Sequence, residues 1–136
     1  MSTAENKATV VAFYNALNEA NYDLAASMCH EDFIFYNQID TPRPGAEGFI
    51  EAEKKHIDAF EGCHFTAETV GEGDRVAAYV LTEGKHTGNF YGMEPTGRTM
   101  RMSMGNFFTF KDGKIIEKRA HYDRHDILQQ LGWMPN

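Results

Sequence analysis

The sequence predicts one α+β domain over residues 1–136, with helices first and a curved mixed or antiparallel sheet after them. Two observations predict this class. Apolar residues recur with the 3.6-residue period of a helix up to about residue 61, and later segments show the two-residue period of strands. A chain of 136 residues and 15.4 kDa also has the usual size of one domain. Three helices against the concave side of such a sheet would leave an apolar pocket with a few polar groups.

The first two helices are predicted from capping residues and apolar spacing. The first begins with Ser2 and Glu5, which have the spacing of a capping box. Its buried face is predicted at i, i+3, i+4 and i+7: Val10, Phe13, Tyr14 and Leu17. A short second helix is predicted over Leu24–Cys29, with Asp23 as its N-cap.

The third helix is predicted over Ala46–Glu61, with Gly62 ending it. One side is formed by Phe49, Ile50, Glu53, His56, Ile57 and Phe60. The charged residues are interpreted mainly as a solvated face: Glu51, Glu53, Lys54, Lys55 and Asp58. His56 lies on the apolar side, where either a hydrogen-bonded core histidine or a base tuned by the cavity fits.

Strands are predicted from aromatic and β-branched residues and from alternation. They are Phe33–Tyr36, His64–Val70, Arg75–His86, Thr99–Phe110 and Ile115–Asp123. Thr41–Gly45 is predicted as a loop because of its prolines and glycine. Asp112 and Gly113 predict a tight hairpin turn. One face of the 99–110 strand carries Met100, Met102, Met104, Asn106, Phe108 and Phe110.

A last helix is predicted over Arg124–Leu131. Asp123 is expected to cap its beginning. Gly132 is expected just past its end, with Trp133 as the hydrophobic partner and Pro135 as the stop.

The charge and cysteine content narrow the possible partners. The net charge of −7 disfavours binding to a nucleic-acid backbone, because that needs a basic face. The absence of a run of about 18 apolar residues predicts no membrane span, and no secretory signal is visible. Cys29 and Cys63 are too few for a disulfide framework and are expected to be reduced thiols in buried helix or at a helix end. A cytoplasmic protein is therefore expected.

Several segments together resemble the SnoaL-like polyketide cyclases. They are Phe13–Asn18, Asp32–Phe33, His86–Gly88, Gly92–Arg98, Asp112–Glu117, Asp123 and Leu128–Gly132. The resemblance implies the cone-shaped nuclear-transport-factor-like fold, shared with ketosteroid isomerases and limonene-type epoxide hydrolases, and often a homodimer. It also implies a cofactor-free intramolecular aldol closure of a polyketide methyl ester, in which a carboxylate moves the proton and polar groups hold the enolate.

The chain departs from this family pattern at its most important position. The acid/base carboxylate of the family is replaced by Ala120, and the tryptophan before it by Arg119. The facing-strand position, which is histidine in the cyclases, is Asn106, whose amide can donate to an oxyanion. The position of the general-base aspartate in the isomerases is Tyr36, with Asn37 beside it.

Four residues are predicted as catalytic: Asn106, His121, Tyr36 and His86. Each has a structural alternative. Asn106 could bridge two strands, and His86 could stabilise the loop that follows it. Strand alternation places His121 on the face opposite to Ala120, unless a bulge turns it inward. The predicted substrate-binding residues are Tyr14, Asn37, His56, Met102, Met104, Phe108, Ala120 and Tyr122. The alternative for the two tyrosines Tyr14 and Tyr36 is aromatic packing.

The favoured function is an enzyme without cofactor that acts on a small, apolar, oxygenated ligand by cyclisation, isomerisation or a hydration-type step. The alternative is a non-catalytic binding or scaffold domain, for which we expect a pocket filled by Met102, Phe108 and Tyr122. A metal site at His121, Asp123 and His125 is disfavoured, because capping by Asp123 would separate the three side chains. No metal and no cofactor are therefore expected.

Overall fold

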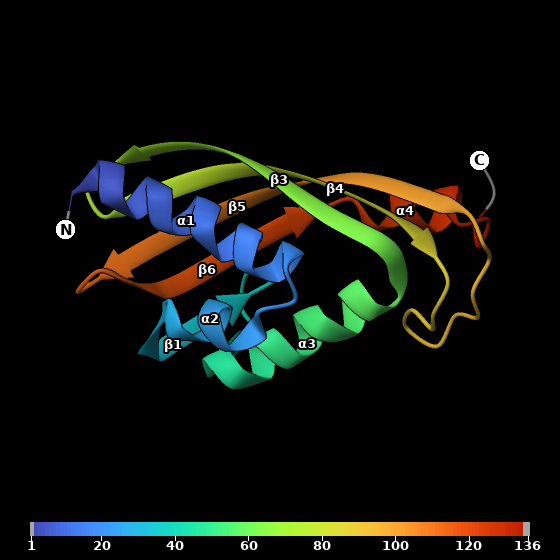
Figure 1. Cartoon of the computed structure of the whole chain (residues 1–136), viewed down its shortest axis with the longest axis horizontal. Coiled ribbons are helices and arrows are strands. Elements are labelled where there is room, and N and C mark those ends of the chain that lie inside the picture. Colours follow the sequence, from blue (N-terminus) through green and yellow to red (C-terminus); the bar gives the residue numbers. More distant parts are fainter. Residues whose placement is uncertain (1, 135–136) are drawn as a thin grey trace.

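A computed structural model describes residues 2–134 as one curved sheet with helices packed against it (Figure 1). The helices are α1 (Thr3–Asn18), α2 (Tyr22–Ser27), α3 (Ala46–Asp58) and α4 (Arg124–Gln130). The strands are β1 (Cys29–Tyr36), β2 (Pro42–Pro44), β3 (Phe60–Glu72), β4 (Arg75–His86), β5 (Thr99–Lys111) and β6 (Lys114–Tyr122). The α+β prediction is confirmed.

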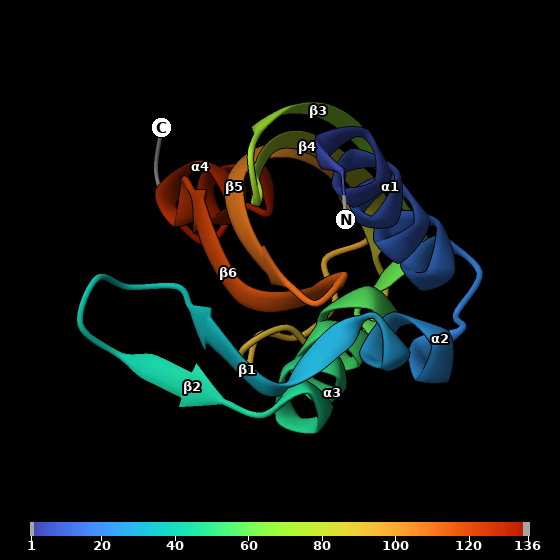
Figure 2. The same ribbon diagram turned by 90° about the vertical axis from the view of Figure 1, so that its left-hand side faces the viewer.

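The sheet has the order β2-β1-β6-β5-β4-β3. Only the β1–β6 pair among these is parallel, so the sheet is mixed. Figure 2 shows β3 to β6 curling around an interior, with α1 and α3 facing the inside of the curve. The four long strands therefore form a wall, and α1 and α3 cover what would otherwise be an open side.

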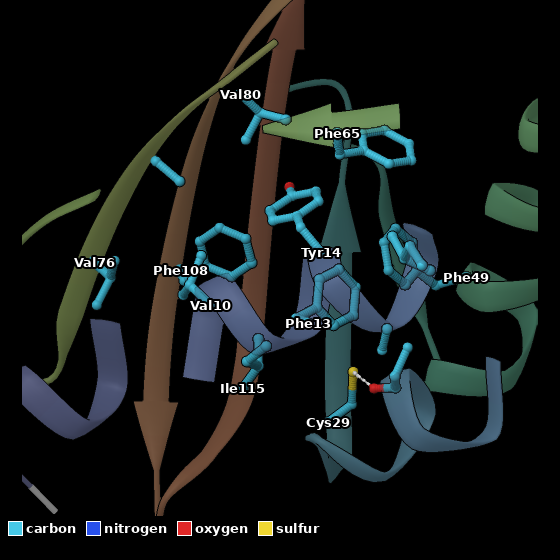
Figure 3. Close-up of a cluster of buried hydrophobic side chains, with 14 of the residues drawn as sticks. Val10, Phe13, Tyr14, Cys29, Phe49, Phe65, Val76, Val80, Phe108 and Ile115 are labelled. Carbon is cyan, nitrogen blue, oxygen red and sulfur yellow. Dashed lines mark hydrogen bonds between the residues drawn. The ribbon is translucent and has the colours of Figure 1, made fainter. Parts of the chain in front are cut away.

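Helix α1 has the predicted beginning and the predicted buried face. The Ser2 hydroxyl accepts from the Glu5 N–H, and the Glu5 side chain accepts from the Ser2 N–H. The apolar stripe of α1 packs against β3 and β4, and Tyr14 and Phe13 also meet Phe108 of β5 (Figure 3). This cluster is the main hydrophobic core and it fixes α1 across the sheet.

The boundaries of α2 and α3 differ from the prediction. Asn21, not Asp23, caps α2, because its side chain accepts from the Leu24 N–H. The helix ends at Ser27, and Cys29 already begins β1, where its thiol contacts the Ala25 carbonyl (Figure 3). Pairing with the sheet therefore takes precedence over local helix propensity at this cysteine.

Helix α3 ends at Asp58 instead of Glu61, and Gly62 does not terminate it. Phe60 already pairs with His86 across β3 and β4. Gly62 lies in β3 at a register shift between Glu61 and His64, with a φ of 69° that suits glycine. The second cysteine, Cys63, therefore lies in a strand and not in a helix.

Part of the predicted 41–45 loop forms a strand. Pro42–Pro44 pairs antiparallel with Ile34–Tyr36 at the edge of the sheet. An edge position tolerates proline, since one side of the strand needs no N–H donor. Proline content alone could not show this pairing, because it depends on the distant strand β1.

The hairpin and the final helix match their predictions closely. Asp112 and Gly113 both have positive φ, as a tight primed turn between β5 and β6 requires. Asp123 caps α4 by accepting from the Asp126 N–H, and Gly132 follows the helix with a φ of 81°. The Trp133 N–H donates to the Leu128 carbonyl, while Pro135 lies outside the described residues. Within residues 2–134, no helix has both the length and the apolarity needed to cross a bilayer.

Candidate active site

A cavity of about 840 Å³ lies between α3 and the concave face of the sheet. Its apolar wall comes from several elements: Phe35, Phe49, Ile57, Phe60, Phe65, Phe90, Met100, Met102, Met104 and Ile127. Its polar wall includes Asn37, Glu53, His56, Tyr91, Lys118 and Tyr122. An apolar chamber with a few polar groups is typical of a small-molecule site.

Lys118 forms the buried end of this cavity, which we define by Phe49, Met104 and Lys118. The lysine is only 3% exposed. Its Nζ donates to Asn106 Oδ1 at 3.0 Å. The Nζ also lies 5.3 Å from the ring centroids of both Phe35 and Phe49. Burial lowers the pKa of Lys118 to about 8, although Glu53 and Cys29 favour the charged form.

Asn106 is held in a fixed orientation behind Lys118. Its Nδ2 donates to the carbonyls of Ala78 and Met104 at 3.5 and 3.4 Å, which leaves Oδ1 for the lysine. Asn106 pairs directly with Ala120 across β5 and β6, as the shared face of the two strands predicts. The amide does not itself line the cavity. Its link to the cavity is the hydrogen bond that it accepts from Lys118, which does line the cavity.

The opposite end is the rim, which we define by His56, Tyr91 and Tyr122. The His56 and Tyr91 rings lie 5.1 Å apart. Burial lowers the pKa of His56, and the Glu53 carboxylate one turn earlier on α3 opposes that shift. Burial, together with a hydrogen bond to Tyr122, raises the pKa of Tyr91. The rim therefore places a neutral imidazole next to phenol hydroxyls.

Six of the predicted substrate-binding and catalytic residues line the cavity: Asn37, His56, Met102, Met104, Ala120 and Tyr122. Asn37 Oδ1 is buried and has no hydrogen-bond partner within residues 2–134, so it is available to a ligand. Tyr14 and Phe108 instead belong to the core that backs the cavity. Figure 3 shows the Tyr14 hydroxyl pointing between Val80 and Phe65. Burial raises the pKa of Tyr14 well above its usual value.

His121 lies on the outer face of β6. Ala120 and Tyr122 line the cavity, whereas His121 is exposed, as strand alternation predicts in the absence of a bulge. Asp123 caps α4 and is not directed to a common point with His121 and His125. Among residues 2–134, no group of three metal-ligating His, Cys, Asp or Glu side chains is found.

His86 and Tyr36 also lie outside the cavity wall. His86 is fully buried and its Nδ1 accepts from the Thr96 N–H, which closes the loop between β4 and β5. Its ring packs 5.3 Å from Phe60. Tyr36 stacks under Arg119, with 4.0 Å between the guanidinium carbon and the ring centroid. These surroundings match the structural alternatives for both residues, and their catalytic roles stay predictions.

Three residues that line the cavity were not among the predicted site residues: Lys118, Glu53 and Tyr91. The signal for Lys118 was present, because it lies two positions before Ala120 on the inward face of the strand. Glu53 was placed on the apolar side of its helix but was interpreted as solvated. Tyr91 lies in an irregular loop with a φ of 51°, where no periodicity could indicate its direction.

The fold and the cavity define a class of cone-shaped α+β proteins with a small-molecule site. Within this class, residues 8–131 match the sequence profile of the SnoaL-like polyketide cyclase family. The chain belongs to this family, and the resemblance noted in the sequence is confirmed.

The curated relatives cover only part of the chain. Nogalonic acid methyl ester cyclase of Streptomyces nogalater is 37% identical over 60 residues, which is 44% of this chain and 45% of that protein. Aklanonic acid methyl ester cyclase AcmA of Streptomyces galilaeus is 37% identical over 59 residues, 43% of this chain and 41% of that protein. The chain thus matches less than half the length of these two polyketide cyclases.

Solved structures match over nearly the whole chain. IdmH of Streptomyces antibioticus, proposed to be a polyketide cyclase, has a TM-score of 0.81 and 27% identity, covering 93% of this chain and 98% of that one. AclR of Streptomyces galilaeus, proposed to be a hydroxylase, has a TM-score of 0.90 at 24% identity, covering 99% and 89%. The second likeness shows the fold alone.

Proposed function

We propose that this protein is a cofactor-free cyclase that closes a ring in an apolar, oxygenated polyketide ester by an intramolecular aldol reaction. The open cavity carries this proposal. Its volume of about 840 Å³ lies within the range of roughly 300–1,000 Å³ that is usual for small-molecule sites. Met102 and Tyr122 line this space instead of filling it, so the non-catalytic alternative loses its expected feature.

His56 is the proposed proton acceptor. Its pKa is lowered by burial, so the imidazole is neutral at pH 7 and can take a proton from the carbon next to a carbonyl. Glu53 precedes it by one helical turn and favours the imidazolium that forms. This pair on α3 supplies the proton transfer for which Ala120 has no functional group.

The enolate oxygen is proposed to lie against donors on β6. The Lys118 ammonium and the Tyr122 hydroxyl both line the cavity, and each can donate to a developing oxyanion. The enolate carbon then attacks a second carbonyl of the same molecule, and the new alkoxide takes the proton back from His56. The product is an isomer of the substrate, and no cofactor or oxidant is consumed.

Turnover of candidate substrates tests this proposal. The purified chain is incubated with nogalonic and aklanonic acid methyl esters, and ring closure is followed as a shift in absorbance and retention time at unchanged mass. We expect His56→Gln to lower kcat/KM by about 100-fold or more, since positioned acid/base groups contribute roughly that much. In the unmodified protein, the rate should rise with pH through the lowered His56 pKa.

His64→Gln is the matched control, because His64 is an exposed histidine on β3 and should leave turnover unchanged. Equal activity of His56→Gln and the unmodified chain would exclude His56 as the base. A loss in His121→Gln instead would assign the proton transfer to the outer face of β6.

We also propose a homodimer formed through the outer face of the sheet, in a reducing compartment such as the cytoplasm. Exposed apolar side chains Val70, Tyr79 and Phe107 share that face. The two free cysteines, Cys29 and Cys63, support a reducing environment. Light scattering of the chain and of Tyr79→Lys tests the dimer, and a monomeric unmodified chain would exclude it.

A further inference from the structure

We propose that Lys118 is an amine nucleophile that binds the carbonyl carbon of the substrate as an iminium ion at the buried end of the cavity. The proposal rests on the function above and adds to it a covalent form of carbonyl activation. It gives a chemical role to Lys118, a residue of the cavity wall that was not among the catalytic residues predicted from the sequence.

The first support is the position of the amine. Lys118 is one of the residues that line the cavity and it is only 3% exposed, so it is in contact with the enclosed space and shielded from bulk solvent. The Nζ lies within 6.0 Å of the ring centroids of Tyr14, Phe35, Phe49 and Phe108. A carbonyl group on an apolar ligand that fills this end would meet the amine directly.

The second support is the lack of an ion-pair partner. Within residues 2–134, no carboxylate lies within salt-bridge distance of Lys118, and its hydrogen bond goes to Asn106 Oδ1. A lysine that served to hold structure would be expected to meet a carboxylate when buried. The largest electrostatic effect of a charged group on Lys118 comes from Glu53, which lines the cavity on α3.

The third support is the orientation of Asn106. The Oδ1 of Asn106 can only accept a hydrogen bond, and it accepts one from Lys118. The Nδ2 of Asn106 already donates to the carbonyls of Ala78 and Met104. Asn106 therefore holds one N–H of the amine without using the lone pair of the nitrogen. That lone pair stays available for an electrophilic carbon, and Asn106 acts as a positioning residue.

Protonation is consistent with this role. With a pKa of about 8, roughly a tenth of Lys118 is neutral at pH 7. An exposed lysine with a pKa near 10.4 has roughly 200-fold less of the neutral amine at that pH. Lysines desolvated in an apolar pocket are activated as nucleophiles in this way.

The proposed reaction needs only Lys118, His56, the substrate and water. The neutral amine adds to the carbonyl carbon, and the carbinolamine hydroxyl takes up one proton from the solvent and leaves as water, which gives the iminium ion; the final hydrolysis to the free amine returns that proton. His56 removes the proton from the adjacent carbon, which gives an enamine, and the enamine carbon forms the new bond to the second carbonyl. His56 returns the proton to the new alkoxide, and water then hydrolyses the iminium to the cyclised ketone and the free amine.

Reductive trapping tests the proposal. The full chain is incubated at pH 7 with a limiting amount of benzaldehyde and sodium cyanoborohydride, and peptide mass spectrometry locates the added benzyl group. We expect Lys118 to be labelled at least 10-fold faster than any exposed lysine, with a pH midpoint near 8. Labelling confined to exposed lysines would overturn the proposal, whether or not the chain cyclises a substrate.

Two variants complete the test. Lys118→Arg keeps the positive charge but cannot form an imine, so trapping at this position and turnover should both be lost. Retained turnover in Lys118→Arg would exclude the covalent step and leave the enolate route through His56 intact. Lys85→Met removes an exposed lysine of β4 and should not change labelling of Lys118.

Asn106→Leu tests the positioning role by a pH profile. Loss of the hydrogen bond to the ammonium should move the midpoint of Lys118 labelling to lower pH, because only the neutral amine tolerates the loss. Thr109→Val, on the opposite face of β5, should leave the midpoint in place. An unchanged midpoint in Asn106→Leu would show that Asn106 does not act on the amine.

Discussion

The buried end of the cavity and its rim both hold polar groups, but they differ in solvation. At the buried end, Lys118 lies among aromatic rings and donates a hydrogen bond to Asn106. At the rim, Tyr91 is 51% exposed and Arg124 lies over its ring, with 4.5 Å between the guanidinium carbon and the ring centroid. Water can hydrate the rim groups and cannot reach the lysine to the same extent.

This difference shows how one small cavity can hold a desolvated amine at one end and hydrated polar groups at the other. Burial changes the protonation of Lys118 strongly, because few groups replace its lost hydration. The rim groups interact at the protein surface, where water weakens each contact. Changes at the buried end should therefore have large effects on the free energy of unfolding, and changes at the rim should have small effects on it.

The largest effect is expected at the aromatic support of the buried end. Phe108→Ala removes a fully buried ring 5.5 Å from Lys118 Nζ and should lower the free energy of unfolding by about 3–5 kcal/mol. Urea denaturation measures this loss. Phe107→Ala is the matched control on the same strand, since Phe107 is 51% exposed and should change the value by about 0.5 kcal/mol or less.

A loss in Phe107→Ala that arises from the proposed dimer should depend on protein concentration, whereas the loss in Phe108→Ala should not. Equal, concentration-independent losses in both variants would contradict the division of β5 into a buried and an exposed face.

The next effect concerns the pH dependence of stability. The pKa of Lys118 is lower in the folded chain, about 8, than the ordinary value of 10.5 in the unfolded chain. The unfolded state therefore binds more protons between these values, and this group makes the folded state more stable as pH rises from 8 to 10.5. The contribution is roughly 3 kcal/mol over that window, by about 1.4 kcal/mol per unit.

Lys118→Met removes this contribution. Below pH 8 the variant should be more stable than the unmodified chain by an amount of that order, and the difference should close as pH approaches 10.5. Urea denaturation at several pH values measures both chains, with Lys85→Met as the exposed control. A constant difference across the window would mean that Lys118 is not desolvated.

The smallest effect is expected at the rim. Arg124→Gln removes the contact between the guanidinium group and the Tyr91 ring, which at an exposed site contributes about 0.5–1 kcal/mol. The positive charge also lies in the first turn of α4, where the helix dipole disfavours it, so part of the loss is offset. Thermal unfolding should show a change below about 1 kcal/mol, and a change as large as that of Phe108→Ala would reverse the comparison.

Local patterns in the sequence predicted much of the fold. The capping box at Ser2, the Asp112–Gly113 turn and the Asp123 cap depend on neighbouring residues, and each was predicted correctly. The end of α3 and the strand β2 were not, because they form by pairing with strands that lie far away in the sequence.

The site residues show the same difference between local patterns, which the sequence predicts, and contacts between distant segments, which it does not. Alternation along β6 correctly predicted that Ala120 and Tyr122 share a face and that His121 faces away. It also gives the direction of Lys118, but not its burial, because the rings around it come from α1, α3, β1 and β5. Contacts between elements so far apart leave no pattern in a single sequence.

The short strand β2 has a further consequence for the behaviour of the protein at high concentration. The Gly45 N–H donates toward β1, to the Phe33 carbonyl, so strand alternation directs the backbone nitrogens of Pro42 and Pro44 to the free side. Neither nitrogen carries a hydrogen, so an added strand would find carbonyl acceptors there but no donors at these two positions. The free side of β2, beside the wall of the cavity, is therefore protected against the edge-to-edge growth that leads open sheets to aggregate.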